Sequence, residues 1–145
     1  MVLRNDDFIA PLCNQQIELL YRDEAILVIN KPTGLLSLSG KNPLNLDSVH
    51  YRLRQQFNDC LLVHRLDFGT SGLMVIAFSK TVNSHLSKQF QQRSVKKKYI
   101  ALLSGQLVCS EGTINAAIAK DPTNFPLMQV CNDTGKPSET LYKVL

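Results

Sequence analysis

The pattern of apolar residues along the chain predicts short strands interspersed with two helices. Strand-like runs occupy residues 17–20 and 25–30, and the acidic turn at residues 22–24 between them is typical of a hairpin. Apolar residues then recur every three or four positions over residues 46–57 and every four over residues 81–93. This spacing places them on one face of a helix, so two amphipathic helices are predicted there.

The rest of the pattern completes a fold-class prediction. Asp47 or Ser48 is expected to cap the first helix, and Thr81 the second. Further strands are predicted at residues 61–63, 73–79, 98–103, 112–118, 127–131 and 139–145. Residues 1–16 follow neither period and are interpreted as an N-terminal arm ahead of one domain, residues 17–145. Together these elements indicate an α+β domain with a mixed, largely antiparallel sheet flanked by helices.

Composition narrows the class of protein. The chain has 145 residues, of which 44% are hydrophobic and 19% charged, as in one soluble globular domain. Its longest apolar run, residues 73–78, is far shorter than the roughly 18 residues of a membrane span. Two aspartates lie where a signal peptide would need an apolar core, so the cytoplasm is the expected location. The four cysteines form no CxxC pair, and no structural metal is expected.

Charge is concentrated in the middle of the chain. Residues 41–100 carry ten basic and three acidic side chains, whereas the segments on either side are slightly acidic. Clustered lysines and arginines attract polyanions such as RNA. The alternative is that these charges lie on solvated helix faces and bind nothing. Charge alone leaves both interpretations open.

The loop HRLDFGTSG, residues 64–72, has the densest chemistry in the chain. It places Asp67 among an arginine, a histidine, two hydroxyls and two glycines between two predicted buried strands. A carboxylate near an opposite charge stays ionised, and an oriented carboxylate can act as a nucleophile or base. The plainer alternative is a structural ion pair of Arg65 with Asp67, with His64 stacked on the core. A serine-hydrolase interpretation with Ser71 and His64 is disfavoured because GTSGL lacks the GxSxG elbow.

Four segments resemble the RluA-type pseudouridine synthases, which isomerise uridine to pseudouridine in RNA. VHRLDFGTSGLMVIAFSK, residues 63–80, is similar to the central signature of that family. VINKPTGLLSLSG resembles its strand and KPxG turn, KKKYIALLSG its KxYxA segment, and GKPSETLYKVL its later strand. The matches occur in the family's order over residues 17–145. The chain is therefore identified as a member, most similar to the dual-specificity ribosomal RNA and tRNA branch.

The resemblance implies a role for several residues. Asp67 would be the catalytic aspartate, and Tyr99 would stack on the flipped uracil and assist proton transfer. Arg65 would fill the space that the flipped nucleotide leaves. Phosphate contacts are expected from four lysines, Lys31, Lys96, Lys97 and Lys98. The reaction is an isomerisation, so the resemblance implies neither a cofactor nor a metal.

The resemblance also predicts that this chain is the N-terminal portion of a catalytic domain. The family has a downstream motif resembling GRTHQLRVH, which supplies a basic partner for the aspartate, and the sequence stops at Leu145 before it. The alternative function is an inactive fragment that acts only as an RNA-binding or assembly module. Self-association through the edge of the truncated sheet is expected, because an unpaired strand recruits partners.

Overall fold

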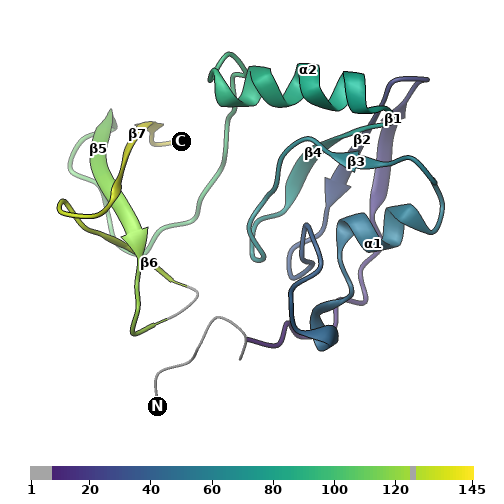
Figure 1. The fold of residues 1–145 in the computed structure, drawn as a ribbon. Helices are drawn as coiled ribbons and strands as arrows, with labels where there is room; N and C mark the ends of the chain where they lie inside the picture. Colours follow the sequence, from purple (N-terminus) through teal and green to yellow (C-terminus); the bar gives the residue numbers. More distant parts are fainter. Residues whose placement is uncertain (1–7, 125–126) are drawn as a thin grey trace. The chain divides into compact units, whose positions relative to one another are not determined.

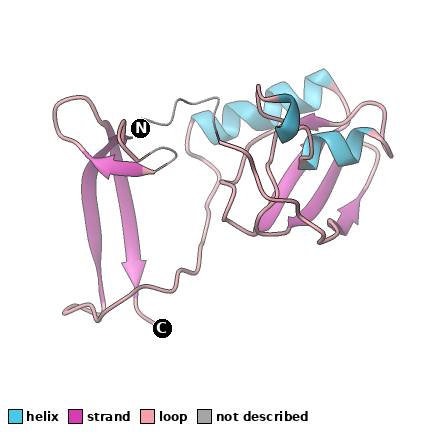
Figure 2. Cartoon of the chain, turned by 90° about the horizontal axis from the view of Figure 1, so that it is seen from below, coloured by secondary structure: helices cyan, strands magenta, loops and turns pink. Residues whose placement is uncertain are grey.

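The chain folds as two compact units. A computed structural model describes residues 8–124 and 127–145. One unit is Ile9–Lys97, and the other contains Lys98–Leu145. Within the described residues all helical segments belong to the first unit, as Figure 2 shows. The predicted α+β class is confirmed, with the strands distributed over two sheets.

A four-stranded antiparallel sheet forms the centre of the first unit (Figure 1). Its strands, in spatial order, are β1 (Glu18–Arg22), β2 (Ile26–Lys31), β4 (Gly72–Ala77) and β3 (Leu61–Leu62). The predicted hairpin is confirmed by the pairing of β1 with β2. Asp23 closes its turn, because one carboxylate oxygen accepts the amide hydrogens of Ala25 at 2.8 Å and Ile26 at 2.7 Å.

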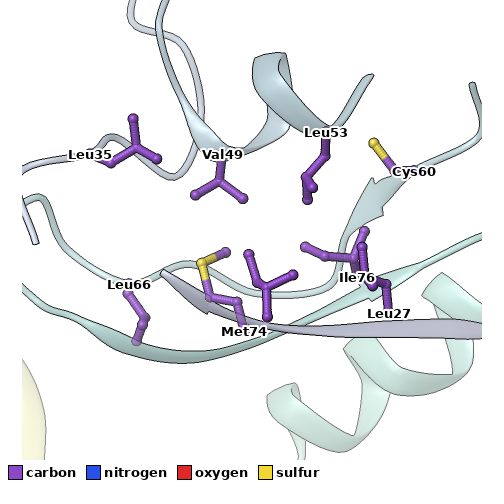
Figure 3. Packing of buried hydrophobic residues seen from close by; sticks show 9 residues of the cluster. Leu27, Leu35, Val49, Leu53, Cys60, Leu66, Met74 and Ile76 are labelled. Atoms are coloured by element: carbon purple, nitrogen blue, oxygen red, sulfur yellow. The ribbon is translucent and has the colours of Figure 1, made fainter. Parts of the chain in front are cut away.

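Two helices pack on this sheet, on opposite faces (Figures 1 and 3). Helix α1 (Val49–Arg54) and strands β2 and β4 contribute most of the buried core that Figure 3 shows. Buried positions alternate along β2, so one face of that strand enters the core. The core cluster consists of Leu27, Ile29, Leu35, Val49, Leu53, Cys60, Leu66, Met74 and Ile76.

Serine hydroxyls begin both helices. The Ser48 hydroxyl accepts the Tyr51 amide hydrogen at 3.1 Å, which confirms one of the two caps predicted for α1. Helix α2 (Lys80–Gln91) begins one residue earlier than predicted, with Ser79 as its N-cap. The prediction of Thr81 as the cap was wrong, because Ser79 is the residue with extended backbone and its hydroxyl accepts the Val82 amide hydrogen at 3.2 Å.

The second unit holds an antiparallel sheet with the order β6-β5-β7. Its strands are β5 (Glu111–Lys120), β6 (Met128–Val130) and β7 (Lys136–Lys143). These correspond to the last three predicted strands, with β7 starting earlier and ending earlier than expected. The strand predicted at residues 98–103 was wrong. An apolar run becomes a strand only by pairing, and here Ile100 is 87% and Leu102 101% exposed outside both sheets.

The described part of the N-terminal arm is held against the first unit. Arg52 of α1 donates to the carbonyl oxygen of Gln15 at 2.6 Å and to that of Cys13. The same guanidinium forms a bidentate pair with Asp47, at 2.7 and 2.6 Å. Arg52 therefore joins residues 13–15 of the arm to α1. Among the described residues, no helix has the length and apolar character needed to cross a membrane.

Candidate active site

The HRLDFGTSG loop begins where the pairing of β3 with β4 stops. The two strands pair at only two positions, and the next amide of β4, that of Val75, donates to Nε2 of the His64 side chain at 3.1 Å. Asn83 of α2 donates to the carbonyl oxygen of Leu62 at 2.9 Å. Side chains thus replace the backbone partners at this point. The chain can leave the sheet there without leaving these polar groups unpaired.

His64 is a structural residue of this junction. Its ring stacks on Phe90 of α2, with centroids 4.3 Å apart and an angle of 16° between the planes. Burial lowers the pKa of His64, a hydrogen bond with the Arg65 backbone raises it, and the positive charge of Lys97 lowers it further. The neutral ring accepts a hydrogen at Nε2, so that atom is not available as a base for Ser71.

Arg65 and Asp67 point away from the core on either side of a buried leucine. Leu66 is 8% exposed and belongs to the core, whereas both of its neighbours are exposed. In the part of the chain that the structure describes, Arg52 with Asp47 is the only ion pair. The predicted alternative of an Arg65–Asp67 ion pair is therefore wrong. The Asp67 carboxylate is open to an incoming ligand.

Lys31 lies beneath this loop and is fully buried. Its ammonium donates to the carbonyl oxygens of Pro32 at 2.9 Å, Leu35 at 2.7 Å and Phe68 at 3.4 Å. Burial lowers the pKa of Lys31, while the charges of Cys13 and Asp67 raise it. The prediction of Lys31 as a phosphate contact is corrected: its three hydrogens point inward, and it joins the KPTG turn to the loop.

Two further contacts join the same turn to the same loop. The Gly34 amide donates to the Phe68 carbonyl oxygen at 2.9 Å, and the Thr33 hydroxyl to that of Gly69 at 2.8 Å. Gly34 has φ of +71°, a left-handed conformation that favours glycine. The backbone immediately after Asp67 is therefore fixed by a turn that lies more than thirty residues earlier in the sequence.

An open groove adjoins the start of the loop. Its volume is about 410 Å³, and it is lined by Leu38, His50, Leu62, Val63, His64 and Arg65. The lining combines apolar walls with two histidines and one arginine. Within residues 8–124 and 127–145, no three histidine, cysteine, aspartate or glutamate side chains gather as metal ligands would. Cys60 is completely buried in the core.

The remaining predicted site residues are exposed and divide between the two units. Lys96 and Lys97 end the first unit, whereas Lys98 and Tyr99 begin the second. The Tyr99 side chain is 63% exposed. The structure thus gathers Lys31, Arg65 and Asp67 around one loop. The roles predicted for Tyr99 and the three lysines stay predictions.

Sequence reasoning missed the residues that hold the loop. Thr33 and Ser37 both bond to its backbone, and neither was given a role although both lie in the VINKPTGLLSLSG segment. The available signal in the sequence was a serine that interrupts the apolar run LLSL, residues 35–38. The structure shows that this serine, Ser37, is only 5% exposed. A buried hydroxyl requires a hydrogen-bond partner, and the loop backbone supplies it.

Comparisons with known proteins agree with this geometry. The family model described as RNA pseudouridylate synthase matches residues 25–145, which include the KPTG turn, the loop and all of the strands except β1. The chain belongs to this family. It is 44% identical over 126 residues to the dual-specificity RNA pseudouridine synthase RluA of Yersinia pestis, covering 87% of this chain and 61% of that protein. The protein of the same name from Haemophilus ducreyi is 44% identical over 138 residues, covering 93% and 62%.

Solved structures give the same result for the fold. Human RNA pseudouridylate synthase domain containing 1 matches with a TM-score of 0.66 and 29% identity, over 90% of this chain and 52% of that one. Human RNA pseudouridylate synthase domain containing 4 matches with a TM-score of 0.65 and 25% identity. The chain therefore spans about half to three fifths of the length of the relatives it matches.

Proposed function

We propose that the chain carries the catalytic aspartate of a pseudouridine synthase, an isomerase that acts on uridine in structured RNA. The observation that carries the proposal is the environment of Asp67. Its carboxylate is exposed and without an ion-pair partner among the described residues. The backbone on both sides of it is bonded to residues 31–37. A rigid backbone with an open carboxylate favours attack on a positioned substrate.

In the proposed reaction Asp67 attacks the target nucleoside after the base has left its stack. The N-glycosidic bond breaks, the base turns, and a carbon–carbon bond forms between C1′ of the ribose and C5 of the base, while the bond that Asp67 made to the nucleoside breaks and returns the free carboxylate. The C5 hydrogen leaves as a proton and the freed ring nitrogen takes one up, so the step balances without an oxidant, reductant or metal. Arg65, exposed beside the groove, is proposed to occupy the vacated position, and Tyr99 to stack on the base.

The proposed partner is ribosomal RNA, tRNA or both. The names of the relatives, dual-specificity RNA pseudouridine synthases, support an RNA substrate, and the choice of ribosomal RNA and tRNA follows from the resemblance of the sequence motifs. The exposed residues Lys96, Lys97 and Lys98 are proposed to contact phosphates, which position RNA without reading its sequence. The cytoplasmic location stays a prediction from the sequence.

The test replaces Asp67 by Asn, which keeps the side-chain volume and removes the charge. Because the chain spans 62% of the Haemophilus ducreyi relative, the assay uses both the chain and the chain continued with the C-terminal part of that protein. Turnover is measured as tritium release from uridine-labelled rRNA and tRNA, and RNA binding by filter retention. We expect binding without turnover in Asp67→Asn, and full turnover in the control Asp59→Asn, whose carboxylate is also exposed. Turnover by Asp67→Asn would remove it from its role.

A binding or assembly module is the second candidate, supported by the exposed apolar side chains of the second unit. Strand β7 lies at the edge of its sheet, where Leu141 is 77% exposed, and Ile114 of the neighbouring β5 is 52% exposed. Exposed edges and apolar faces recruit other chains. This candidate predicts concentration-dependent association in sedimentation, with RNA binding and no turnover. A monomer with multiple turnover would exclude it.

A further inference from the structure

Ser37 makes the shortest of the contacts between the KPTGLLS segment and the HRLDFGTSG loop. Its hydroxyl donates to the carbonyl oxygen of Leu66 at 2.6 Å and accepts the amide hydrogen of the same residue at 3.1 Å. One side chain therefore satisfies both backbone groups of the residue that precedes Asp67. A hydroxyl is suited to this because it is both donor and acceptor.

Leu66 needs such a partner because of its position. Its side chain is in the core at 8% exposure, and the pairing of β3 with β4 has ended four residues earlier, at Leu62. In the described part of the chain no strand pairs with its amide or carbonyl, and an unpaired buried backbone group is costly. The hydroxyl of Ser37, a residue that is 5% exposed, supplies the hydrogen bonds that a neighbouring strand would otherwise make to Leu66.

Ser37 is itself held by helix α1. Its carbonyl oxygen accepts the His50 amide hydrogen at 3.2 Å, and that of Leu36 accepts the Val49 amide hydrogen at 2.8 Å. Its hydroxyl also lies 3.7 Å from the sulfur of Met74 in β4. The hydroxyl thus connects the first turn of a helix to the backbone beside Asp67.

We infer that Ser37 is a positioning residue for catalysis: its hydroxyl fixes the backbone at Leu66 and so directs the Asp67 carboxylate toward the substrate. The catalytic part of this inference rests on the function proposed for Asp67. Ser37 itself touches no substrate. Its loss should lower the rate constant with bound RNA and leave the affinity for RNA unchanged, because a small misplacement of a reacting group is enough to slow the chemistry.

The test compares Ser37→Ala with Ser39→Ala and Ser37→Thr. Ser39 is the matched control, because its hydroxyl bonds to the Leu46 carbonyl oxygen at 2.6 Å and contacts Ser48, away from the loop. Threonine keeps the hydroxyl and adds one methyl group. Amide hydrogen exchange is followed by NMR at Leu66 and at Thr70, whose amide donates to the Asp67 carbonyl oxygen at 3.1 Å.

In Ser37→Ala we expect exchange at Leu66 and Thr70 to be about tenfold faster, with the β2–β4 ladder unchanged, because only a local opening becomes easier. In the continued chain, kcat should fall about tenfold or more at an unchanged KM. Ser37→Thr should keep both the exchange rates and kcat close to the wild-type values, and Ser39→Ala should change neither. Unchanged exchange at Leu66, or equal acceleration throughout the ladder, would overturn the inference.

The exchange measurement separates this inference from the proposed function. Full turnover by Asp67→Asn would contradict the proposed function, and with it the catalytic part of the Ser37 assignment. A local acceleration of exchange in Ser37→Ala would still establish that its hydroxyl holds the loop. Normal kcat in Ser37→Ala, with Asp67→Asn inactive, would overturn the positioning role alone.

Discussion

Replacing Lys31 by methionine tests how the HRLDFGTSG loop is held. Methionine keeps most of the apolar stem and removes the ammonium that donates to three carbonyl oxygens. The Phe68 oxygen retains the Gly34 amide as a partner, whereas the buried oxygens of Pro32 and Leu35 lose the ammonium. Each buried group left unpaired costs about 1–3 kcal/mol, which gives roughly 2–6 kcal/mol for the two.

Part of that cost is offset, because the variant no longer buries an ammonium. Burial lowers the pKa of Lys31, so the folded state disfavours its charged form. We therefore expect Lys31→Met to lower the free energy of unfolding by about 2–4 kcal/mol. Urea unfolding followed by ellipticity at about 222 nm reports on α1 and α2, which both belong to the unit that contains Lys31.

The control is Lys88→Met, at an exposed position of α2, which should change stability by less than about 0.5 kcal/mol. A Lys31→Met variant as stable as this control would refute the argument that the ammonium holds the turn and the loop together. The same variant should bind RNA with the wild-type dependence on salt, since a buried lysine releases no counterions. A flatter salt dependence would restore Lys31 as a phosphate contact.

Two further predictions concern the surface lysines and the junction histidine. Changing residues 96–98 together to alanine should weaken binding about equally for matched and unrelated RNAs and flatten its salt dependence; a sequence-selective loss, or none, would contradict the phosphate role. His64 has a lowered pKa, so its contribution to stability is complete above the unfolded value of about 6.5 and is lost as the pH falls toward the folded value. Unfolding of His64→Gln should therefore depend less on pH between about 5 and 7 than that of the wild type or of His85→Gln, a control at an exposed site of α2. An unchanged pH dependence would show that the ring does not become protonated on unfolding.

The sequence by itself determined those elements that depend on local pattern. The hairpin, both helices, the β4 strand and the three last strands follow from periodicity and turn residues, and the structure confirms them. The HRLDFGTSG loop was recognisable as the candidate site because its functional groups are contiguous in the chain. The functional groups of this loop and the apolar period of each element both depend on residues that are close together in the sequence.

Tertiary structure decided what each polar side chain does, because that depends on partners distant in the sequence. Lys31 looked like a surface cation, yet the carbonyl oxygen of Phe68, 37 residues away, accepts one of its hydrogens. Ser37 looked unremarkable, and its partner Leu66 lies 29 residues away. Residues 98–103 had the pattern of a strand but no pairing in either sheet. Hydrogen-bond partners across such separations are chosen by packing, so no local pattern could have predicted them.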